Sequence, residues 1–308
     1  MSGADHHDSP EAPVLVLGAT GGQGGAVAAA LITAGRRVRA LVRNAQTPQG
    51  RRLAAAGAEL VTGDFTDVDA LTAAMRGAAA AFTLTTPFET GPSAELAQGH
   101  AIITAAVESR LPHLVFSSVA GAVEHTHIPH FESKAEVEQL IVGSGIAHTI
   151  VAPTYFYDNA LGSSSDILLG LLQLPLPADR PLQQLDRADL GSFVELILHN
   201  PTRFSGARIE LASDQPTPLQ MAQALSVALS RPVDYQQTPL SAVRSASADM
   251  GAMWDYLRGP GYHVDIAALQ ARYPDSTSTS FTDWAKSTFA ANSSRADLQR
   301  SLRQNGER

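Results

Sequence analysis

The sequence predicts an α/β protein, with a doubly wound parallel sheet in its N-terminal half and a smaller, mixed α/β C-terminal lobe. Short aliphatic runs alternate regularly with helix-forming stretches up to about residue 152, which is the pattern of parallel strands joined by helical crossovers. The first aliphatic run leads directly into a glycine-rich turn. After Pro153 the alternation becomes irregular, and prolines cluster at Pro175, Pro177 and Pro181.

The strands expected in the N-terminal half are short and apolar, as in a sheet that is covered on both faces. They are Val14–Leu17, Val38–Val42, Glu59–Thr62, Ala79–Leu84, Leu114–Ser117 and His148–Val151. The helices expected between them are Ala26–Ala34, Gln49–Ala56, Asp67–Arg76, Ala94–Ser109 and Phe131–Gly143. We expect right-handed crossovers throughout this half.

The C-terminal lobe is expected to mix short strands with helices. Its strand-like segments are Leu182–Gln184, Arg208–Leu211 and Val233–Gln236, and helices are expected to cover Arg187–His199, Pro218–Ser230, Leu240–Leu257 and Ile266–Ala271. The sequence therefore predicts four regions. These are a disordered leader over residues 1–12, a sheet domain over 13–152, a smaller lobe over 153–290 that shares one cleft with it, and a frayed tail over 291–308.

The composition narrows the classes of protein to which the chain can belong. Its formal net charge of −8 offers no broad basic surface to phosphates, so we expect no direct nucleic-acid binding. The chain has no cysteine, which excludes disulfides, thiolate nucleophiles and cysteine zinc sites. No apolar run is long enough to span a bilayer, and the N-terminal residues carry no signal-peptide core. We therefore expect a cytoplasmic protein without a membrane partner.

The strongest chemical signal is the turn that follows the first strand. Gly18, Gly21 and Gly24 stand at Gly-x-x-Gly-x-x-Gly spacing between that strand and the first helix. Gly18 allows the tight turn, Gly21 lets the backbone approach a pyrophosphate, and Gly24 lets the helix pack closely on the strand. The N–H groups of the helix start then face the phosphates. The motif predicts a Rossmann-type dinucleotide site, and the alternative is a glycine-rich loop without a ligand.

The end of the second strand indicates which dinucleotide is bound. In NAD-binding proteins an acidic residue near this place takes the ribose 2′-hydroxyl, whereas here Arg43 is followed by Asn44. An arginine suits a 2′-phosphate by its charge and planar fork, so we expect NADP(H); the alternative is a solvated surface arginine. After the third strand, Asp64 and Phe65 are placed to flank the adenine. The alternative is that Asp64 belongs to an ordinary turn while Asp67 caps the next helix.

Five segments together resemble the NmrA-like family of atypical short-chain dehydrogenase/reductases. They are Gly18–Gly24, Gly63–Phe65, Leu84–Phe88, His130–Glu138 and Pro153–Asn159. The resemblance covers about residues 13 to 290. It implies a Rossmann domain with a small α/β lobe and a preference for NADP(H).

The resemblance also implies a set of cofactor contacts. The pyrophosphate would be held by Gly18, Ala19, Thr20, Gly21, Gly22 and Gln23, with Gly24 completing the turn, and the 2′-phosphate by Arg43. Asp64 and Phe65 would contact the adenosine, Thr85, Thr86, Pro87 and Lys134 the nicotinamide-side ribose, and Tyr155, Phe156 and Asn159 would close over the nicotinamide. One departure concerns the helix after the fourth strand. Family members often carry a basic residue there, whereas this chain offers none over residues 95–99, so one cofactor contact is expected to be missing.

The candidate catalytic residues are Lys134 and His130. Typical short-chain reductases use Tyr-x-x-x-Lys, in which the tyrosine donates a proton and the lysine binds the ribose, whereas this chain has His130 four residues before Lys134. A histidine can act as an acid or base near pH 7, or it can simply start a helix. Ser117 and Ser118 either polarise a substrate or bond to the backbone, and we favour the second. The histidines of the 125–130 loop have few acidic neighbours, so we expect no metal site.

Two functions are compatible with this reading. The first is an NADPH-dependent reductase of a small carbonyl, quinone or imine substrate, in which the cofactor supplies the hydride. The second is a non-catalytic redox sensor that binds NADP(H) and acts on a regulated protein partner. The missing tyrosine favours the sensor, and a cofactor cleft under a variable lobe favours the reductase, which we take as the first prediction. We expect a monomer or a homodimer in either case.

Overall fold

The computed structural model describes residues 12–87 and 91–290 of the chain. Residues 1–11 of the predicted leader, and the whole of the predicted tail over 291–308, lie outside the described residues. Within the described part, no helix is both long and apolar enough to cross a membrane.

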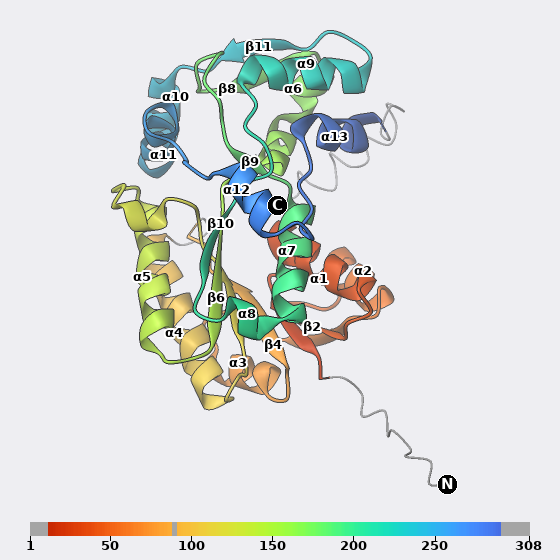
Figure 1. The fold of residues 1–308 in the computed structure, drawn as a ribbon, viewed down its shortest axis with the longest axis vertical. Coiled ribbons are helices and arrows are strands. Elements are labelled where there is room, and N and C mark those ends of the chain that lie inside the picture. Colours follow the sequence, from red (N-terminus) through yellow and green to blue (C-terminus); the bar gives the residue numbers. More distant parts are fainter. Residues whose placement is uncertain (1–11, 88–90, 291–308) are drawn as a thin grey trace. The chain divides into compact units, whose positions relative to one another are not determined.

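The main sheet of the described residues has seven strands in the order β10-β6-β5-β4-β1-β2-β3 (Figure 1). The pairs β1–β2, β2–β3, β1–β4, β4–β5 and β5–β6 are all parallel. The strand order reverses between β1 and β4, the point at which doubly wound sheets bind ligands. The predicted fold class is therefore confirmed. The strands are β1 (Val14–Leu17), β2 (Val38–Val42), β3 (Glu59–Thr62), β4 (Ala80–Leu84), β5 (Leu114–Ser117), β6 (His148–Pro153) and β10 (Arg208–Leu211).

The seventh strand, β10, corrects one part of the predicted organisation. We predicted Arg208–Leu211 as a strand of the C-terminal lobe, and the structure has these bounds but places the strand beside β6 in the main sheet. Ile209 and Leu211 are buried and alternate with partly exposed neighbours. This alternation suits a sheet edge as well as a strand in a small lobe, so the sequence alone does not choose between the two.

Backbone contacts group the chain into two compact units. The first unit takes residues 1–118, 136–151 and 191–208, and the second takes 119–135, 152–190 and 209–308. The boundary that we predicted after residue 152 differs from this division. It places residues 119–135 in the sheet domain and residues 191–208 in the C-terminal lobe, whereas the contacts group them the other way. The residues of the candidate site are therefore described unit by unit below.

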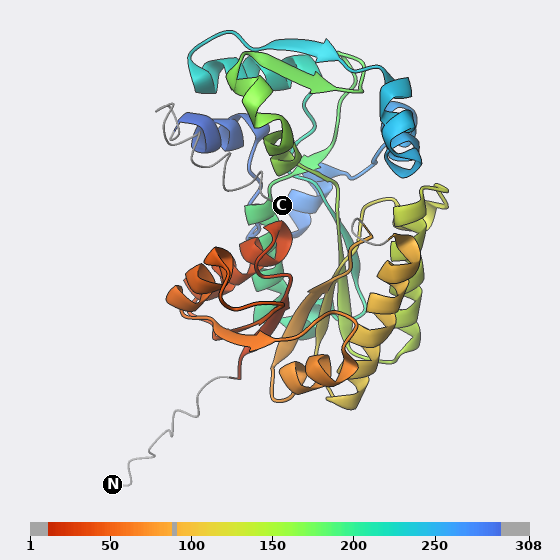
Figure 2. The same cartoon turned by 180° about the vertical axis from the view of Figure 1, so that it is seen from behind.

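Helices cover both faces of the main sheet in the first unit (Figures 1 and 2). One face carries α3 and α4 with the C-terminal part of α5, and the other carries α1 and α2 with the C-terminal part of α7. Leu15, Leu71 and Phe116 are buried in the core between the sheet and the first of these layers. The helices are α1 (Gly22–Thr33), α2 (Pro48–Ala55), α3 (Val68–Met75), α4 (Pro92–Glu108), α5 (Pro129–Gly143), α7 (Arg187–His199) and the short α8 (Pro201–Phe204).

The second unit contains two small parallel sheets among its described residues. One pairs β7 (Tyr155–Phe156) with β9 (Gln184–Leu185), and the other pairs β8 (Leu171–Leu174) with β11 (Asp234–Gln237). Its core includes the rings of Tyr157, Phe281 and Trp284, whose centroids lie 5.2–5.6 Å apart. The helices are α6 (Ser164–Leu168), α9 (Pro218–Leu229), α10 (Leu240–Ala246), α11 (Ala248–Arg258), α12 (Ile266–Arg272) and α13 (Phe281–Ala285).

The helical stretch predicted over Leu240–Leu257 consists of two helices that meet at Ser247. The Ser247 hydroxyl accepts a hydrogen bond from the Met250 N–H at 3.2 Å and so caps the start of α11. Arg244 of α10 and Asp255 of α11 form a bidentate ion pair, with one Nη2 to Oδ2 distance of 2.6 Å. The cap and the ion pair together hold the two helices folded against each other.

Candidate functional site

The turn between β1 and α1 has the geometry of an anion cradle. Gly18 has φ +66°, which favours glycine, and its carbonyl accepts a hydrogen bond from the Gly21 N–H at 2.9 Å. A Cβ on Gly24 would lie 2.4 Å from the carbonyl carbon and oxygen of Gly18, so the helix approaches the turn as closely as the backbone allows. Gly21 precedes α1 without a side-chain cap. The N–H groups of the helix start are thus left to water or to an anion.

The neighbouring residues of the turn differ in exposure. Gly21 and Gly22 are exposed, Thr20 is partly exposed, and Ala19 is buried. The side-chain oxygen of Gln23 accepts a hydrogen bond from the Ser117 hydroxyl at 2.7 Å. This bond ties the end of β5 to the start of α1, and it leaves the amide N–H₂ of Gln23 as the group that can donate to an anion. We favoured a bond to the backbone for Ser117, and the structure instead pairs its hydroxyl with the side chain of Gln23.

Arg43 and Asp64 lie beyond the C-terminal ends of β2 and β3, which are adjacent parallel strands. Both side chains are exposed. The Asp64 carboxylate accepts hydrogen bonds from the Thr66 N–H at 3.0 Å and the Thr66 hydroxyl at 2.8 Å. These bonds, and to a smaller extent the charge of Arg43, lower the pKa of Asp64. The structure thus gives Asp64 a turn-forming role, and its predicted contact with the adenosine stays a prediction.

Two residues of α4 fix the segment that follows β4. The Thr85 hydroxyl donates to the carboxylate of Glu95 at 2.9 Å, and both residues are buried. The side chain of Gln98 accepts from the Thr86 N–H at 3.0 Å and donates to the Thr86 carbonyl at 3.4 Å. Glu95 and Gln98 belong to the stretch in which the sequence offers no basic residue. This stretch instead supplies hydrogen bonds that hold Thr85 and Thr86, next to the buried Pro87.

A buried network of polar side chains beside the end of β5 was not predicted from the sequence. The Ser118 hydroxyl donates a short hydrogen bond to the Glu138 carboxylate, and Arg208 Nε donates to its other oxygen at 2.8 Å. Glu138 is 4% exposed. These three residues come from distant parts of the chain and form a buried structural network in the first unit. The sequence carries no local signal for such a network.

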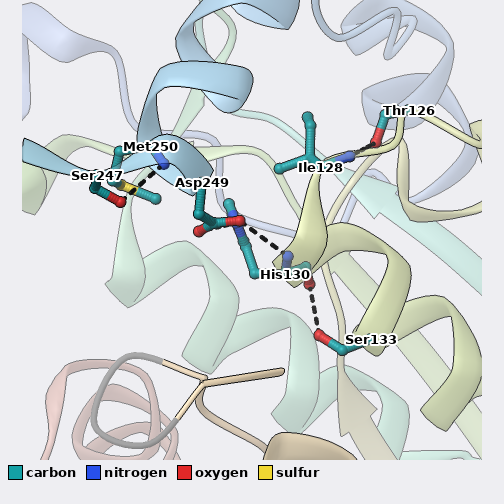
Figure 3. Close-up of polar contacts among 7 residues, drawn as sticks. All are labelled: Thr126, Ile128, His130, Ser133, Ser247, Asp249 and Met250. Carbon is teal, nitrogen blue, oxygen red and sulfur yellow. Dashed lines mark hydrogen bonds and ion pairs between the residues drawn. The ribbon is translucent and has the colours of Figure 1, made fainter. Parts of the chain in front are cut away.

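In the second unit, His130 and Lys134 lie one turn apart on α5, and both are buried. Residues at this spacing share a helix face. The His130 ring bonds to Asp249 of α11, with Nδ1 at 2.7 Å from Oδ2 and 2.9 Å from Oδ1 (Figure 3). Asp249 was missed at the sequence level because it lies 119 residues from His130.

Tyr155, Phe156 and Asn159 follow β6 in the second unit. Burial raises the pKa of the Tyr155 hydroxyl to about 12, and a hydrogen bond with the Asn159 side chain opposes this rise. The Tyr155 ring lies 5.5 Å from the ring of Trp254, and the Phe156 ring lies under the Arg187 guanidinium at 5.6 Å. Tyr155 and Asn159 are thus brought together, whereas Phe156 packs with a different partner.

Histidines and carboxylates of the described residues form no group of three or more that is placed to hold a metal ion. His125 and His127 are exposed, and both have positive φ values, 54° and 60°. They therefore lie in a strained surface loop. His130 points instead to Asp249.

These features define a Rossmann-type α/β protein with a glycine-rich turn between β1 and α1. The NmrA-like family model matches residues 10–259, so the chain belongs to the NmrA-like family. Its relatives include the NAD(P)H azoreductase of Xenophilus azovorans, 28% identical over 90% of this chain and 98% of the relative. They also include the (4-alkanoyl-5-oxo-2,5-dihydrofuran-3-yl)methyl phosphate reductase of Streptomyces griseus, 30% identical over 76% of this chain and 79% of the relative.

Solved structures share the fold over almost the whole chain. The NADPH-dependent quinone oxidoreductase of Escherichia coli, solved with NADPH, aligns with a TM-score of 0.75 over 90% of this chain and 99% of that chain, at 23% identity. NmrA, a negative transcriptional regulator solved with NAD, aligns with a TM-score of 0.72 over 92% of this chain and 97% of that chain, at 20% identity. At these identities the likeness establishes the fold alone.

Proposed function

We propose that the chain binds NADP(H) and acts as an NADPH-dependent reductase of a small carbonyl, quinone or imine substrate. The observation that carries the proposal is the β1–α1 turn. Gly24 lies where a Cβ would meet backbone at 2.4 Å, and the helix start has no side-chain cap. A turn built in this way fits a pyrophosphate, because its backbone N–H groups can approach the oxygens without side chains between them.

Each proposed cofactor contact follows from a position in this structure or from the family resemblance. The N–H groups of Gly21, Gly22 and Gln23 would hold the pyrophosphate. Arg43 is exposed beside the end of β2, where its guanidinium can hold a 2′-phosphate, so we propose NADP(H) in preference to NAD(H). The contacts that the resemblance implies for Lys134, Tyr155, Phe156 and Asn159 remain part of the proposal. When bound, the reduced nicotinamide supplies the hydride.

Two relatives support the choice of a reductase, since their names describe an NAD(P)H azoreductase and a reductase of a phosphorylated furanone. The second candidate function is a redox sensor that acts on a protein partner. It is favoured by one observation, which is that position 130 holds a histidine where typical short-chain reductases have a tyrosine.

The proposal is tested by titrating the purified protein with NADPH and with NADH in a calorimeter. The absorbance at 340 nm is then followed against a panel of quinones, azo compounds, aldehydes, ketones and imines. We expect NADPH to bind at least about tenfold more tightly than NADH, and at least one acceptor to be reduced. Tight binding of NADPH without turnover of any acceptor would support the sensor. Failure to bind either dinucleotide would reject both functions.

A further inference from the structure

The start of α5 is held by a residue from a distant part of the chain. His130 lies in the first turn of this helix, where the backbone N–H groups have no partner within the helix. Its N–H donates to Asp249 Oδ1 at 3.1 Å, so the carboxylate caps α5 from outside. On the other side of the same residue, the His130 carbonyl accepts from the Ser133 hydroxyl at 3.3 Å (Figure 3). The backbone of His130 is therefore fixed at both ends.

The same carboxylate also holds the imidazole ring. His130 Nδ1 lies 2.9 Å from Asp249 Oδ1 and 2.7 Å from Oδ2. A carboxylate can only accept hydrogen bonds, so the proton on this side belongs to Nδ1. The side chain of His130 is 6% exposed and that of Asp249 is 27% exposed. The bond therefore lies largely out of water, where it fixes the orientation of the ring more firmly than a surface contact would.

Asp249 is itself held rigidly in the second unit. It lies in the first turn of α11, which Ser247 caps through the Met250 N–H. A negative charge at this position is stabilised by the helix dipole of α11, and the same charge suits the N-terminus of α5. The starts of α5 and α11 thus meet at the Asp249 carboxylate. Capping α5 requires only the bond to the His130 N–H, so the bond to the imidazole ring is an additional contact. A serine or an asparagine at position 249 would also accept from the His130 N–H.

We propose that Asp249 is a positioning residue. It accepts the Nδ1–H of His130, which fixes the neutral ring in the Nδ1–H tautomer, and it orients Nε2 of the protonated ring as the proton donor of the reductase reaction. The chemical role of His130 rests on the proposed function, whereas the tautomer does not. When bound, the reduced nicotinamide would supply the hydride for the carbonyl carbon. As the C=O π bond breaks, the oxygen takes the Nε2 proton of the imidazolium form of His130. The neutral ring would keep its proton on Nδ1, hydrogen-bonded to the Asp249 carboxylate, and Nε2 would be reprotonated from solvent.

The experiment uses the full chain with Asp249→Asn as the main variant. Asparagine keeps an acceptor for the His130 N–H but removes the charge, and its N–H₂ group can face the ring. Asp255→Asn is the matched control, because Asp255 lies on the same helix, is about half exposed and pairs with Arg244. Asp249→Glu restores a carboxylate, and it provides a second test if the asparagine variant folds poorly. Thermal unfolding of all three variants measures any purely structural effect.

The first readout does not depend on turnover. Nitrogen-15 imidazole spectra of histidine-labelled protein distinguish the two ring tautomers, and His130→Gln identifies the His130 signals among the ten histidines. We expect the Nδ1–H tautomer in the wild type and in Asp255→Asn, and its loss in Asp249→Asn. If Asp249→Asn keeps the Nδ1–H tautomer, Asp249 does not position the ring and the proposal is overturned.

The second readout is turnover of whichever acceptor the wild type reduces. We expect Asp249→Asn to lower kcat about tenfold or more, with the Kd for NADPH changed less than about twofold, and Asp249→Glu to recover part of the loss. Unchanged kcat in Asp249→Asn would overturn the catalytic role. If the wild type reduces no acceptor, the reductase proposal fails, and the tautomer spectra still decide whether Asp249 positions His130.

Discussion

The tight packing of α1 on the β1–α1 turn makes Gly24→Ala a direct test of the proposed cofactor site. The added Cβ would lie 2.4 Å from the carbonyl carbon and oxygen of Gly18 and 2.5 Å from the Leu17 oxygen. All three atoms are backbone, so no side chain can swing away. Since non-bonded atoms sit about 3.5 Å apart, the start of α1 must move by about 1 Å from the turn.

The magnitude follows from two opposing effects. Overpacking of this kind costs about 1–3 kcal/mol, while alanine in a helix gains about 0.5–1 kcal/mol over glycine. We expect a net loss of about 1–2 kcal/mol in the free energy of unfolding. The effect on binding should be larger, because a displacement of about 1 Å in groups that position a ligand can cost about a hundredfold. We expect the Kd for NADPH to rise at least about tenfold.

The assay combines urea unfolding followed by circular dichroism with calorimetric titration of NADPH. Gly25→Ala is the matched control, since its Cβ would lie 3.3 Å from the Ala19 oxygen and needs only a small adjustment. We expect the control to bind NADPH within about threefold of the wild type and to lose no stability. A Gly24→Ala protein that folds and binds NADPH like the wild type would refute the assignment of this turn to the pyrophosphate.

Three further predictions concern the first unit. Arg43→Asp should raise the Kd for NADPH about tenfold or more, because a charged hydrogen bond to the 2′-phosphate is lost, and should leave the Kd for NADH unchanged. An equal rise in both Kd values in a calorimetric titration would argue against a 2′-phosphate contact. Glu138→Ala should lower the free energy of unfolding by about 2–3 kcal/mol, because it leaves Ser118 and Arg208 without the buried carboxylate; exposed Glu136→Ala should change it little in the same urea assay. Burial lowers the pKa of His113 to about 4, so the unfolded chain takes up this proton first and stability falls as the pH drops from about 6.5 toward 4. When the pH is lowered from 7 to 5, the free energy of unfolding measured in urea should fall by about 2 kcal/mol less in His113→Gln than in the wild type. Equal falls in the two proteins would contradict this prediction.

The fold and the geometry of the glycine-rich turn were predictable because their signals are local. The strand β1, the three glycines and the start of α1 are consecutive in the chain, and each glycine is required by the backbone geometry at its own position. The strands of the main sheet are likewise short apolar runs whose neighbours are set by the crossover rules. The partner of β10 was not predictable, because an alternating strand of four residues does not specify which sheet edge it joins.

The polar contacts around the candidate site depend on tertiary structure and left no such signal. His130 and Asp249 are 119 residues apart, and Ser118, Glu138 and Arg208 meet only when three elements pack together. Thr85 and Glu95 are ten residues apart, yet their buried pairing requires α4 to fold back on the end of β4. In each case the residue type indicates what a side chain can bond to, and only the fold decides which partner it meets.

These contacts bear on how the proposed site of the first unit would hold an anion with few basic side chains. The side chains of Gln23, Thr85 and Asp64 each form a hydrogen bond within the protein through one oxygen. These bonds order the segments at the ends of β3, β4 and β5, and the carboxyl ends of parallel strands are where such sheets bind ligands. In the proposed site the pyrophosphate would then be held mainly by backbone N–H groups. Truncating a side chain does not remove these groups, but a shift of the helix start can misplace them. The structure therefore predicts greater sensitivity to an added methyl group at Gly24 than to the loss of any one of these polar side chains.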